Sequence, residues 1–468
     1  MPKLTPLSNK KNSKMKLKYI LIMILIFSSQ VGKSQENSMY FLRGVPQNNS
    51  INASAIPKGT GYIGFPLLSS LQLDYYNSGL TIKDLLHKGT GQRSDSLIID
   101  YSGAAKALDA NNVFFQELSN TLLGFGFKIK KSYISFALNS RVKTKIAYPG
   151  SIGDWKNGNY DYNSNSPLVL TTQGMALNMI AYNELALGYA QPIGDKFDVG
   201  VRLKYIMGMA NIASDKFDIT VNTLSSSELQ LQTDIAIQTN FPISANTGSH
   251  GFVNIDSIST NSSPDIKQMF LNNRGFGFDL GVTYRPIPRL SLGIALNDIG
   301  FISWNSYPNR FVSNSTYKYT GVDLSNMLGG QSTNSSEYFK NMQDSIKNSF
   351  KIESNTASFQ TGLQGNMIIT ANFIMLKWLD LGTMVKTQFY QGRPYPSLGF
   401  ACGMSPSKLF SSTVTYSLRK GSYLNLGVGM AFNPGPFQIY IVTDNIPYLF
   451  AIESANALSM RMGINYLF

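Results

Sequence analysis

Hydrophobic and polar residues alternate strictly in many segments of this 468-residue chain. The alternation is clearest in residues 196–205, 274–285 and 422–432. In the second of these segments one face is wholly apolar and carries Phe276, Phe278, Leu280, Val282 and Tyr284. The opposite face carries glycine, aspartate and threonine. A two-residue period indicates β-strands whose two faces meet different surroundings.

This alternation predicts fourteen strands, at 62–75, 122–130, 132–142, 183–191, 196–207, 274–285, 289–298, 364–376, 379–390, 396–404, 408–418, 422–432, 436–443 and 458–468. Tight turns join many of them, and the proline and glycine found there fit turns and would break strands. The remaining connections are long and polar, at 76–121, 143–182, 208–273, 299–363 and 444–457. Loops of such length are rare in compact soluble domains.

Two folds fit alternating strands, because the apolar face can pack on a second sheet in a soluble sandwich or contact lipid in a membrane barrel. Periodicity alone does not separate them. Outer-membrane barrels have an even number of strands and alternate short periplasmic turns with long external loops. The chain follows that pattern. We therefore predict an all-β fold, in which residues 59–468 form a transmembrane antiparallel outer-membrane β-barrel of about 14 strands.

The amino terminus has the order of a secretory signal peptide. Residues 1–34 contain seven lysines and no acidic residue, and the apolar run Tyr19–Phe27 is followed by small residues. A spanning helix needs roughly 20 apolar residues, so this short run favours a cleaved signal over a permanent anchor. We predict cleavage after Ser34. Met15 opens a compact signal on its own, which leaves residues 1–14 open as a start-site artefact.

Removal of the signal lowers the formal net charge from +13 to +6, so the basic character comes in part from targeting. The mature part has no basic cluster interleaved with aromatic residues, and no nucleic-acid partner is expected. Residues 35–58 are expected to lie in the periplasm or in the barrel lumen. An apolar residue at every fourth position of 334–350 predicts a short helix, either packed on loop neighbours or capping the pore.

The last strand carries the most specific signal. Counting back from the carboxyl terminus, every second residue is apolar, which gives the set Phe468, Tyr466, Ile464, Met462 and Met460. This pattern resembles the terminal signal read by the barrel assembly machinery, because a strand edge with one apolar face can pair with a template strand. The alternative is an ordinary amphipathic terminal strand. We expect the cell outer membrane as location, with outer-membrane lipid and the barrel assembly machinery as partners.

Four segments resemble a known family. They are 275–281 (GFGFDLG), 297–304 (NDIGFISW), 435–445 (GPFQIYIVTDN) and 461–465 (RMGIN). Together and in this order they resemble a family of outer-membrane proteins from the phylum Bacteroidota, domain of unknown function 5723. Since members of that family have no agreed activity, the resemblance implies fold and location. The strand number is also similar to that of outer-membrane long-chain fatty-acid transporters, whose amino-terminal segment plugs the barrel with an Asn-Pro-Ala signature. Residues 52–57 (NASAIP) depart from that signature.

Candidate catalytic chemistry is sparse. His87 and His250, the two histidines, fall in predicted loops without the spacing of a metal site or a catalytic triad. The glycines of 275–281 alternate inside a strand and do not open a helix, so they are no dinucleotide fingerprint. The single cysteine, Cys402, shares the lipid-facing parity of its strand. We predict no enzyme, no metal and no cofactor.

Two functions remain. In the first, the barrel is a channel or transporter for small apolar or amphipathic solutes, with a lumen lined partly by glycine, alanine and serine. The candidate lumen-lining residues are Asp198, Arg202, Lys204, Asp279, Arg461 and Asn465. In the second, a non-enzymatic structural or secretion-accessory barrel binds a protein partner, such as a secretion or gliding protein, through its long external loops. Such barrels act as accessory shuttles in Bacteroidota protein secretion and gliding.

Overall fold

A computed structural model describes residues 37–468 except 92–93, 162–163, 165, 226–227, 245–258, 261–264, 320–350, 391 and 420–421. The expected signal peptide of residues 1–34, the helix expected within 334–350, and His250 lie outside the described residues.

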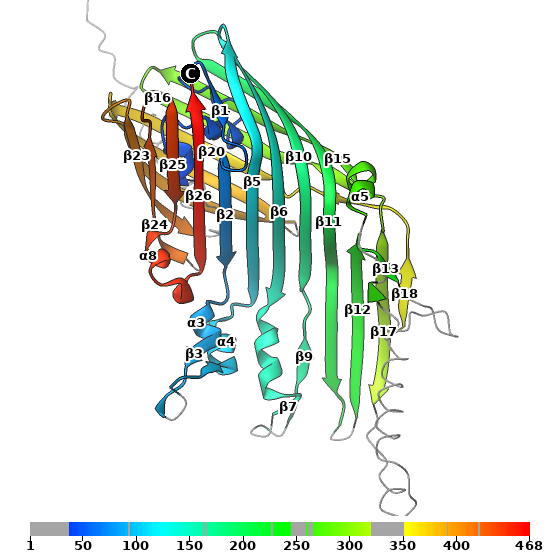
Figure 1. Cartoon of the computed structure of the whole chain (residues 1–468). Coiled ribbons are helices and arrows are strands. Elements are labelled where there is room, and N and C mark those ends of the chain that lie inside the picture. The colour runs from blue at the N-terminus through cyan, green and yellow to red at the C-terminus, as the bar shows by residue number, and fades with distance from the viewer. Residues whose placement is uncertain are drawn as a thin grey trace, which may run out of the picture.

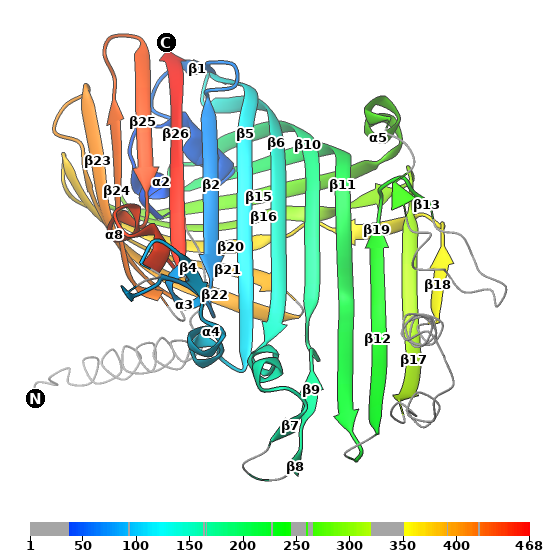
Figure 2. The ribbon, with the colours of Figure 1, turned by 60° about the horizontal axis from the view of Figure 1, so that its bottom comes forward.

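Fourteen antiparallel strands form a closed barrel (Figures 1 and 2). Around the barrel they are β2 (Ser70–Asn77), β5 (Asn111–Ile129), β6 (Ser132–Pro149), β10 (Ala176–Ile193), β11 (Phe197–Thr223), β15 (Arg274–Ile287), β16 (Leu290–Trp304), β20 (Asn366–Leu376), β21 (Leu379–Tyr390), β22 (Arg393–Met404), β23 (Phe410–Arg419), β24 (Ser422–Phe432), β25 (Phe437–Thr443) and β26 (Ala457–Leu467). The barrel closes where β26 pairs with β25 on one side and with β2 and β1 (Gly61–Gly64) on the other. The predicted fold and strand number are confirmed.

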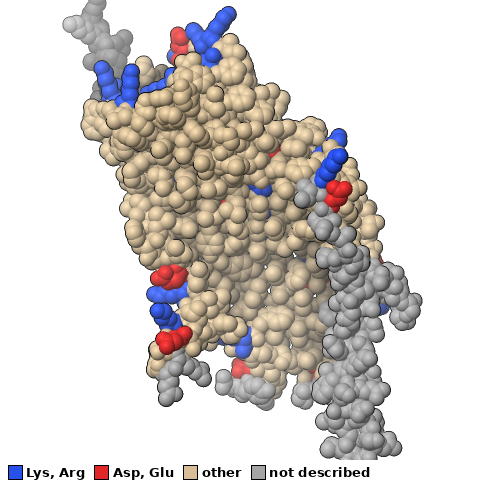
Figure 3. All heavy atoms as spheres, viewed as in Figure 1, with Lys and Arg blue, Asp and Glu red and all other residues tan. Residues whose placement is uncertain are grey.

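The outer face of the barrel is apolar and uncovered. On β15, Phe276 and Leu280 are 60% and 41% exposed, whereas Gly277 and Asp279 on the inner face are buried. Figure 3 shows a broad band of the visible wall with almost no Lys, Arg, Asp or Glu, with charges gathered toward the two ends. A continuous exposed apolar band of this kind marks a membrane-contacting surface. The chain is therefore a transmembrane barrel of the outer-membrane type.

The two ends of the barrel differ. The carboxyl terminus and the tight turns lie at one end, and the long loops lie at the other (Figure 1). Lys130, Gly194 and Gly435 adopt positive φ angles of 57°, 61° and 63° in three of the predicted turns. A left-handed backbone reverses the chain within a few residues. The turn end is the periplasmic end, and the loop end is external.

The long loops contain short elements. They are α3 (Ile82–Leu85), β3 (Leu86–Lys88), β4 (Leu97–Ile99), α4 (Tyr101–Ala107), η3 (Gly150–Asn157), β7 (Tyr160–Asp161), β8 (Ser166–Pro167), β9 (Val169–Thr171), β13 (Ile243–Ser244), β14 (Ser259–Thr260), α5 (Ile266–Asn272), α8 (Ile446–Leu449) and η5 (Ile452–Ser454). None of the described helices is long and apolar enough to cross a membrane.

The described parts of two predicted loops are largely strand. Within 208–273 and 299–363, β11 and β16 run beyond their predicted ends, and the additional strands are β12 (Leu229–Thr239), β17 (Asn309–Tyr319), β18 (Ile352–Asn355) and β19 (Phe359–Gly362). The sheet continues past the lipid band through the pairs β11–β12, β12–β17 and β17–β18. Outside lipid the outward face of a strand need not be apolar. The alternation of apolar and polar residues that was used to place the strands is therefore weaker there. Residues 229–239 (LQLQTDIAIQT) still alternate, and this signal was missed.

The predicted single strand 62–75 is split. Between β1 and β2 the chain leaves the sheet at Phe65–Ser69, where Pro66 has no amide hydrogen to donate and Leu67 has a φ of 64°. Because this excursion folds inward, a Cβ at Gly64 would overlap the Ser69 side chain. The backbone carbonyl of Ser69 thereby accepts hydrogen bonds from groups in the lumen.

Candidate functional site

Residues 37–57 lie inside the barrel, toward its periplasmic end, and are named here the luminal plug (Figure 2, blue). The plug contains α2 (Asn37–Phe41) and the short 3-10 helix η1 (Pro46–Ser50). Most of its residues up to Ser54 are buried. A short connection then leads to β1. The lumen is therefore occupied by a segment that is separate from the barrel wall.

Hydrogen bonds tie the plug to strands on every side of the barrel. The Ser38 amide donates to Asp444 (2.9 Å), Tyr40 bonds Thr370 (2.9 Å), Gln47 donates to Asn465 (2.6 Å), Arg202 donates to the Asn49 carbonyl (2.6 Å), and Asn297 donates to the Ile51 carbonyl (2.9 Å). Within the described residues, the ion pair between plug and wall is Arg43 with Asp380, at 3.0 Å. The position of the plug is thus fixed by many hydrogen bonds, some of them to charged groups, and by one ion pair.

Apolar packing adds to these bonds. Plug residues Met39, Phe41, Leu42, Val45 and Ile51 form one buried cluster with side chains of the inner wall. On the wall the cluster includes Ile368, Met384 and Tyr440. Two further buried apolar clusters contain no plug residue, one around Phe115 and Tyr390 and one around Ile206 and Trp304.

Glycines on the inner face make room for the plug. A Cβ at Gly200 would overlap the Ala53 carbonyl, and one at Gly281 would overlap the Asn52 side chain. Other inner glycines approach the plug in the same way, at Gly382, Gly399 and Gly427. In the sequence, a lumen lined partly by glycine, alanine and serine favours a solute channel. At these positions the glycines instead allow close approach of the plug backbone.

An ion network spans the lumen on the external side of the plug. The Lys204 ammonium lies 2.7 Å from Asp279 and also contacts Asp298, which accepts from Lys143 at 2.6 Å. Arg141 pairs with Glu184 at 3.1 Å and with Asp298 at 3.3 Å. Asp298 stands at a bulge of β16 with a φ of 57°, which brings its carboxylate among three cations from β6 and β11.

The six predicted lumen residues are all buried inside the barrel, but they do not form one site. Arg202, Lys204 and Asp279 meet in the ion network, with Arg202 3.7 Å from Asp279. Asp198 pairs instead with Arg285 near the periplasmic turn. Arg461 donates to Ser70 and to Ser50 of the plug, and Asn465 bonds Gln47 of the plug and Gln438.

Sequence reasoning missed four members of the network: Arg141, Lys143, Glu184 and Asp298. The first two belong to the inner-face series Asn139, Arg141, Lys143 and Lys145, which is visible in the sequence as polar residues at every second position. The predicted strand ended at residue 142 and cut this series. Asp298 was placed at a strand end, where a bulge in fact lets β16 continue to Trp304.

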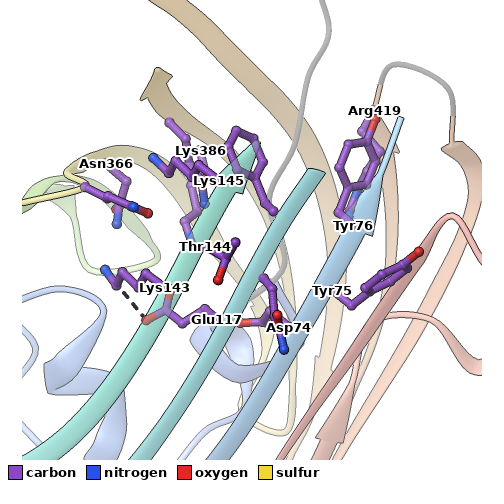
Figure 4. A pocket seen from close by; sticks show the side chains of 14 residues that line it. Asp74, Tyr75, Tyr76, Glu117, Lys143, Thr144, Lys145, Asn366, Lys386 and Arg419 are labelled. Atoms are coloured by element: carbon purple, nitrogen blue, oxygen red, sulfur yellow. Dashed lines mark ion pairs between the residues drawn. The ribbon is translucent and has the colours of Figure 1, made fainter. Parts of the chain in front are cut away.

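A cavity of about 50 Å³ lies beside the network, further toward the external end. Its charged lining consists of Asp74, Glu117, Lys143, Lys145, Lys386 and Arg419 (Figure 4). The ring of Phe115, which also lines the cavity, lies 6.0 Å from that of Tyr390 and 5.8 Å from that of Tyr395 on the opposite wall. Strands from opposite sides therefore meet across the lumen here.

The histidines and the cysteine contribute no site in the described structure. His87 is exposed, and its Nε2 lies 3.9 Å from Asp100. No group of three or more potential metal ligands occurs among the described residues. Cys402 is partly exposed, on the outward parity of β22.

The terminal strand presents its predicted apolar stripe outward. Met462, Tyr466 and Phe468 are 39%, 42% and 52% exposed, and Met460 and Ile464 share their face of β26. The inner face of the strand carries Arg461 and Asn465. Recognition of this stripe by the assembly machinery stays a prediction.

The closed barrel, its apolar belt and its plugged, charged lumen define an outer-membrane β-barrel of the channel-like class. The chain belongs to the family described as "Family of unknown function (DUF5723)", whose model matches residues 54–444. This confirms the resemblance found in the sequence. No curated protein matches the chain.

Similarity to solved structures is low. The toluene transporter TbuX of Ralstonia pickettii is 8% identical with a TM-score of 0.42, over 94% of this chain and 99% of that chain. A FadL homologue of Pseudomonas aeruginosa is 11% identical with a TM-score of 0.37, over 93% and 97%. The translocator domain of the autotransporter NalP from Neisseria meningitidis is 10% identical with a TM-score of 0.31, over 90% and 93%.

Proposed function

We propose that this barrel is an outer-membrane channel for small amphipathic solutes, closed at rest by the luminal plug. One observation carries the proposal: the plug fills the lumen but supplies no strand to the barrel wall. The wall is closed by its own strand pairing, from β1 and β2 to β26. Displacement of the plug would therefore clear the periplasmic part of the lumen without breaking the sheet.

The lining favours an amphipathic solute over a purely apolar one. On the external side of the plug the lumen presents the ion network and the charged cavity. An apolar solute would remove water from Lys143, Lys145 and Lys386 without replacing its hydrogen bonds, which is unfavourable. A solute with a polar or charged end can replace those bonds.

The test is conductance of the mature chain, residues 35–468, in planar bilayers, compared with a variant that lacks residues 37–57. We expect rare or small openings for the full mature chain and a large, steady conductance for the deletion variant. Heat-modifiable migration in gels establishes that both barrels are folded. A folded deletion variant without conductance, and without solute uptake in liposome-swelling assays, would contradict the channel function.

The expectations about export belong to the same proposal. Residues 1–34 would be removed, so that the mature chain begins near Gln35 and fractionates with outer membranes. Mass spectrometry of the amino terminus tests this, and an intact segment 16–33 in the membrane fraction would disprove the cleavage.

A second candidate function is the binding of a protein partner at the external end. It is favoured by the extension of β11, β12 and β17 beyond the barrel, which builds a sheet that is not needed to close the wall (Figure 2). Affinity purification from outer membranes tests it. Recovery of the barrel alone under mild detergent would remove its support.

A further inference from the structure

We propose that the charged luminal cavity binds an oxyanion of the phosphate class, either free or as the head group of a larger solute. The proposal rests on the channel function and names the polar group that its solute carries. The cavity is bounded by β2, β5 and β6 on one wall and by β20, β21 and β23 on the other.

The lining has a surplus of positive charge. Four cationic side chains and two carboxylates contribute to it: Lys143, Lys145, Lys386 and Arg419, with Asp74 and Glu117. The Glu117 carboxylate is shared, because it lies 3.7 Å from both Lys143 and Arg141. The lining itself therefore has a formal charge of +2. Buried like charges repel strongly where the dielectric constant is low, and a bound anion relieves that repulsion.

Lys145 lies at the centre of the argument. Its ammonium donates to the Phe389 carbonyl at 3.3 Å and lies 5.1 Å and 5.8 Å from the ring centroids of Phe115 and Tyr390. Within the described residues no carboxylate lies at ion-pair distance from it. Carbonyl and ring contacts supply only partial negative charge. An ammonium group has three hydrogens, so Lys145 retains donor capacity for an anion.

The geometry suits a compact, multiply charged group. In Figure 4 the side chains of Lys145 and Lys386 lie close together, from β6 and β21, whereas that of Lys143 lies apart from them, beside Glu117. Arg419 lies on the other side, with its guanidinium carbon 5.7 Å from the Tyr76 ring centroid. The side-chain amides of Asn366 and Gln388 also line the cavity. A phosphate offers several acceptor oxygens to donors that come from different directions, whereas a neutral group adds no negative charge to offset the net positive charge of the lining.

Binding is measured by isothermal titration calorimetry of the purified mature barrel in a neutral detergent. The probes are inorganic phosphate, octyl phosphate and, as the neutral comparator, octyl glucoside. We expect at least one phosphate probe to bind and the glucoside not to bind. Charge-assisted hydrogen bonds are strong enough that Lys145→Met and Lys386→Met should each weaken phosphate binding about tenfold or more. Lys145→Arg, which keeps the charge, should retain most of the affinity.

Lys216→Met is the matched control. This lysine side chain is 60% exposed on β11 and pairs with Asp234 outside the lumen, so its removal should leave binding unchanged. Each variant is first shown to be folded by heat-modifiable migration. Binding of inorganic phosphate identifies a free oxyanion as a sufficient ligand, and binding of octyl phosphate alone identifies a head group.

The proposal is overturned if neither phosphate probe binds, or if a folded Lys145→Met barrel binds phosphate as tightly as the unmodified chain. Because binding is measured without a membrane potential or a flux, its failure is distinguishable from failure of the channel function. A barrel that conducts without binding phosphate would keep the channel and lose the anion site. A barrel that binds phosphate but shows no conductance after deletion of the plug would keep the anion site and lose the channel function.

Discussion

The ion pair between Arg43 and Asp380 offers the sharpest perturbation of the luminal plug. It joins the plug to the start of β21 at 3.0 Å, and the side chains are 19% and 3% exposed. Arg43→Ala removes the cation and leaves a carboxylate buried beneath the plug. Removing one partner of a buried pair typically costs about 3–5 kcal/mol. That cost falls on the plugged state alone, because Asp380 gains water when the plug leaves.

At about 1.4 kcal/mol per factor of ten, the ratio of unplugged to plugged barrels should rise by roughly two to four orders of magnitude. Because the Arg43 side chain is more exposed than that of Asp380, the two single variants should differ. Asp380→Asn leaves Arg43 partly in contact with solvent, so it should open the barrel less than Arg43→Ala does. The double variant carries no buried charge at this position and should be more firmly plugged than Arg43→Ala alone.

Open probability in single-channel recordings measures this ratio for the unmodified chain, the two single variants and the double variant. The complete set forms a double-mutant cycle, which isolates the interaction from the loss of each side chain. If Arg43→Ala recordings match those of the unmodified barrel, the pair does not hold the plug. If the double variant opens as often as Arg43→Ala, the buried carboxylate is not the cause.

Five further variants test the plug and the terminal strand. Leu42→Ala, which empties a fully buried position of the plug, should cost the plugged state about 2–5 kcal/mol and raise open probability without changing the thermal stability of the sheet, as followed by gel migration. Gly200→Val should displace the plug because its side chain overlaps a backbone carbonyl, whereas Gly362→Val should not, because its Cβ would lie 3.9 Å from the Gly300 carbonyl oxygen, an ordinary contact distance. Equal conductance of the two variants would contradict this. Phe468→Asp, outward at the barrel end, should reduce the amount in the outer membrane through slow assembly, since near an interface the equilibrium cost of a charge is only about 0–1 kcal/mol. Asn465→Ala on the inner face should assemble normally but loosen the plug, and wild-type membrane levels of both terminal variants would disprove the assembly signal.

The barrel strands could be predicted because lipid imposes a simple rule on one face. Every strand that crosses the apolar belt needs apolar residues at alternate positions, and each of the fourteen showed them. The rule stops where the membrane stops. Strands such as β12 and β17 extend beyond the belt, where pairing continues but the outward residues are polar, and they were interpreted as loops. The opposite error occurs at Pro66. There the alternation continues without interruption and predicts one strand, but the sheet is broken between β1 and β2.

The sequence predicts which of these side chains face the lumen, but not which of them contact one another. Inward parity placed Arg202, Lys204 and Asp279 correctly inside the barrel, because parity is a local property. Their partners are not local: Asp298 enters the network through a bulge, and Lys143 comes from a strand on the other side of β10. The plug gave even less signal, since residues 37–57 lack a regular period and are held by contacts with strands hundreds of residues away.

The residues of the inner wall thus serve different roles at different levels along the barrel axis. Toward the periplasmic end the wall must let a folded segment approach the strands closely, and there Gly200 and Gly281 leave room that any side chain would fill. Toward the external end the same strands carry the buried charges of Arg202, Lys204 and Asp279. Because the plug bonds strands on all sides, a small outward movement of one wall strand cannot free a path past it. In the proposed channel, a solute in the charged cavity would pass only when the plug shifts as a unit. Opening should therefore depend on the plug contacts as a set, and the effects of Arg43→Ala and Leu42→Ala on open probability should be additive in free energy if the two contacts act independently.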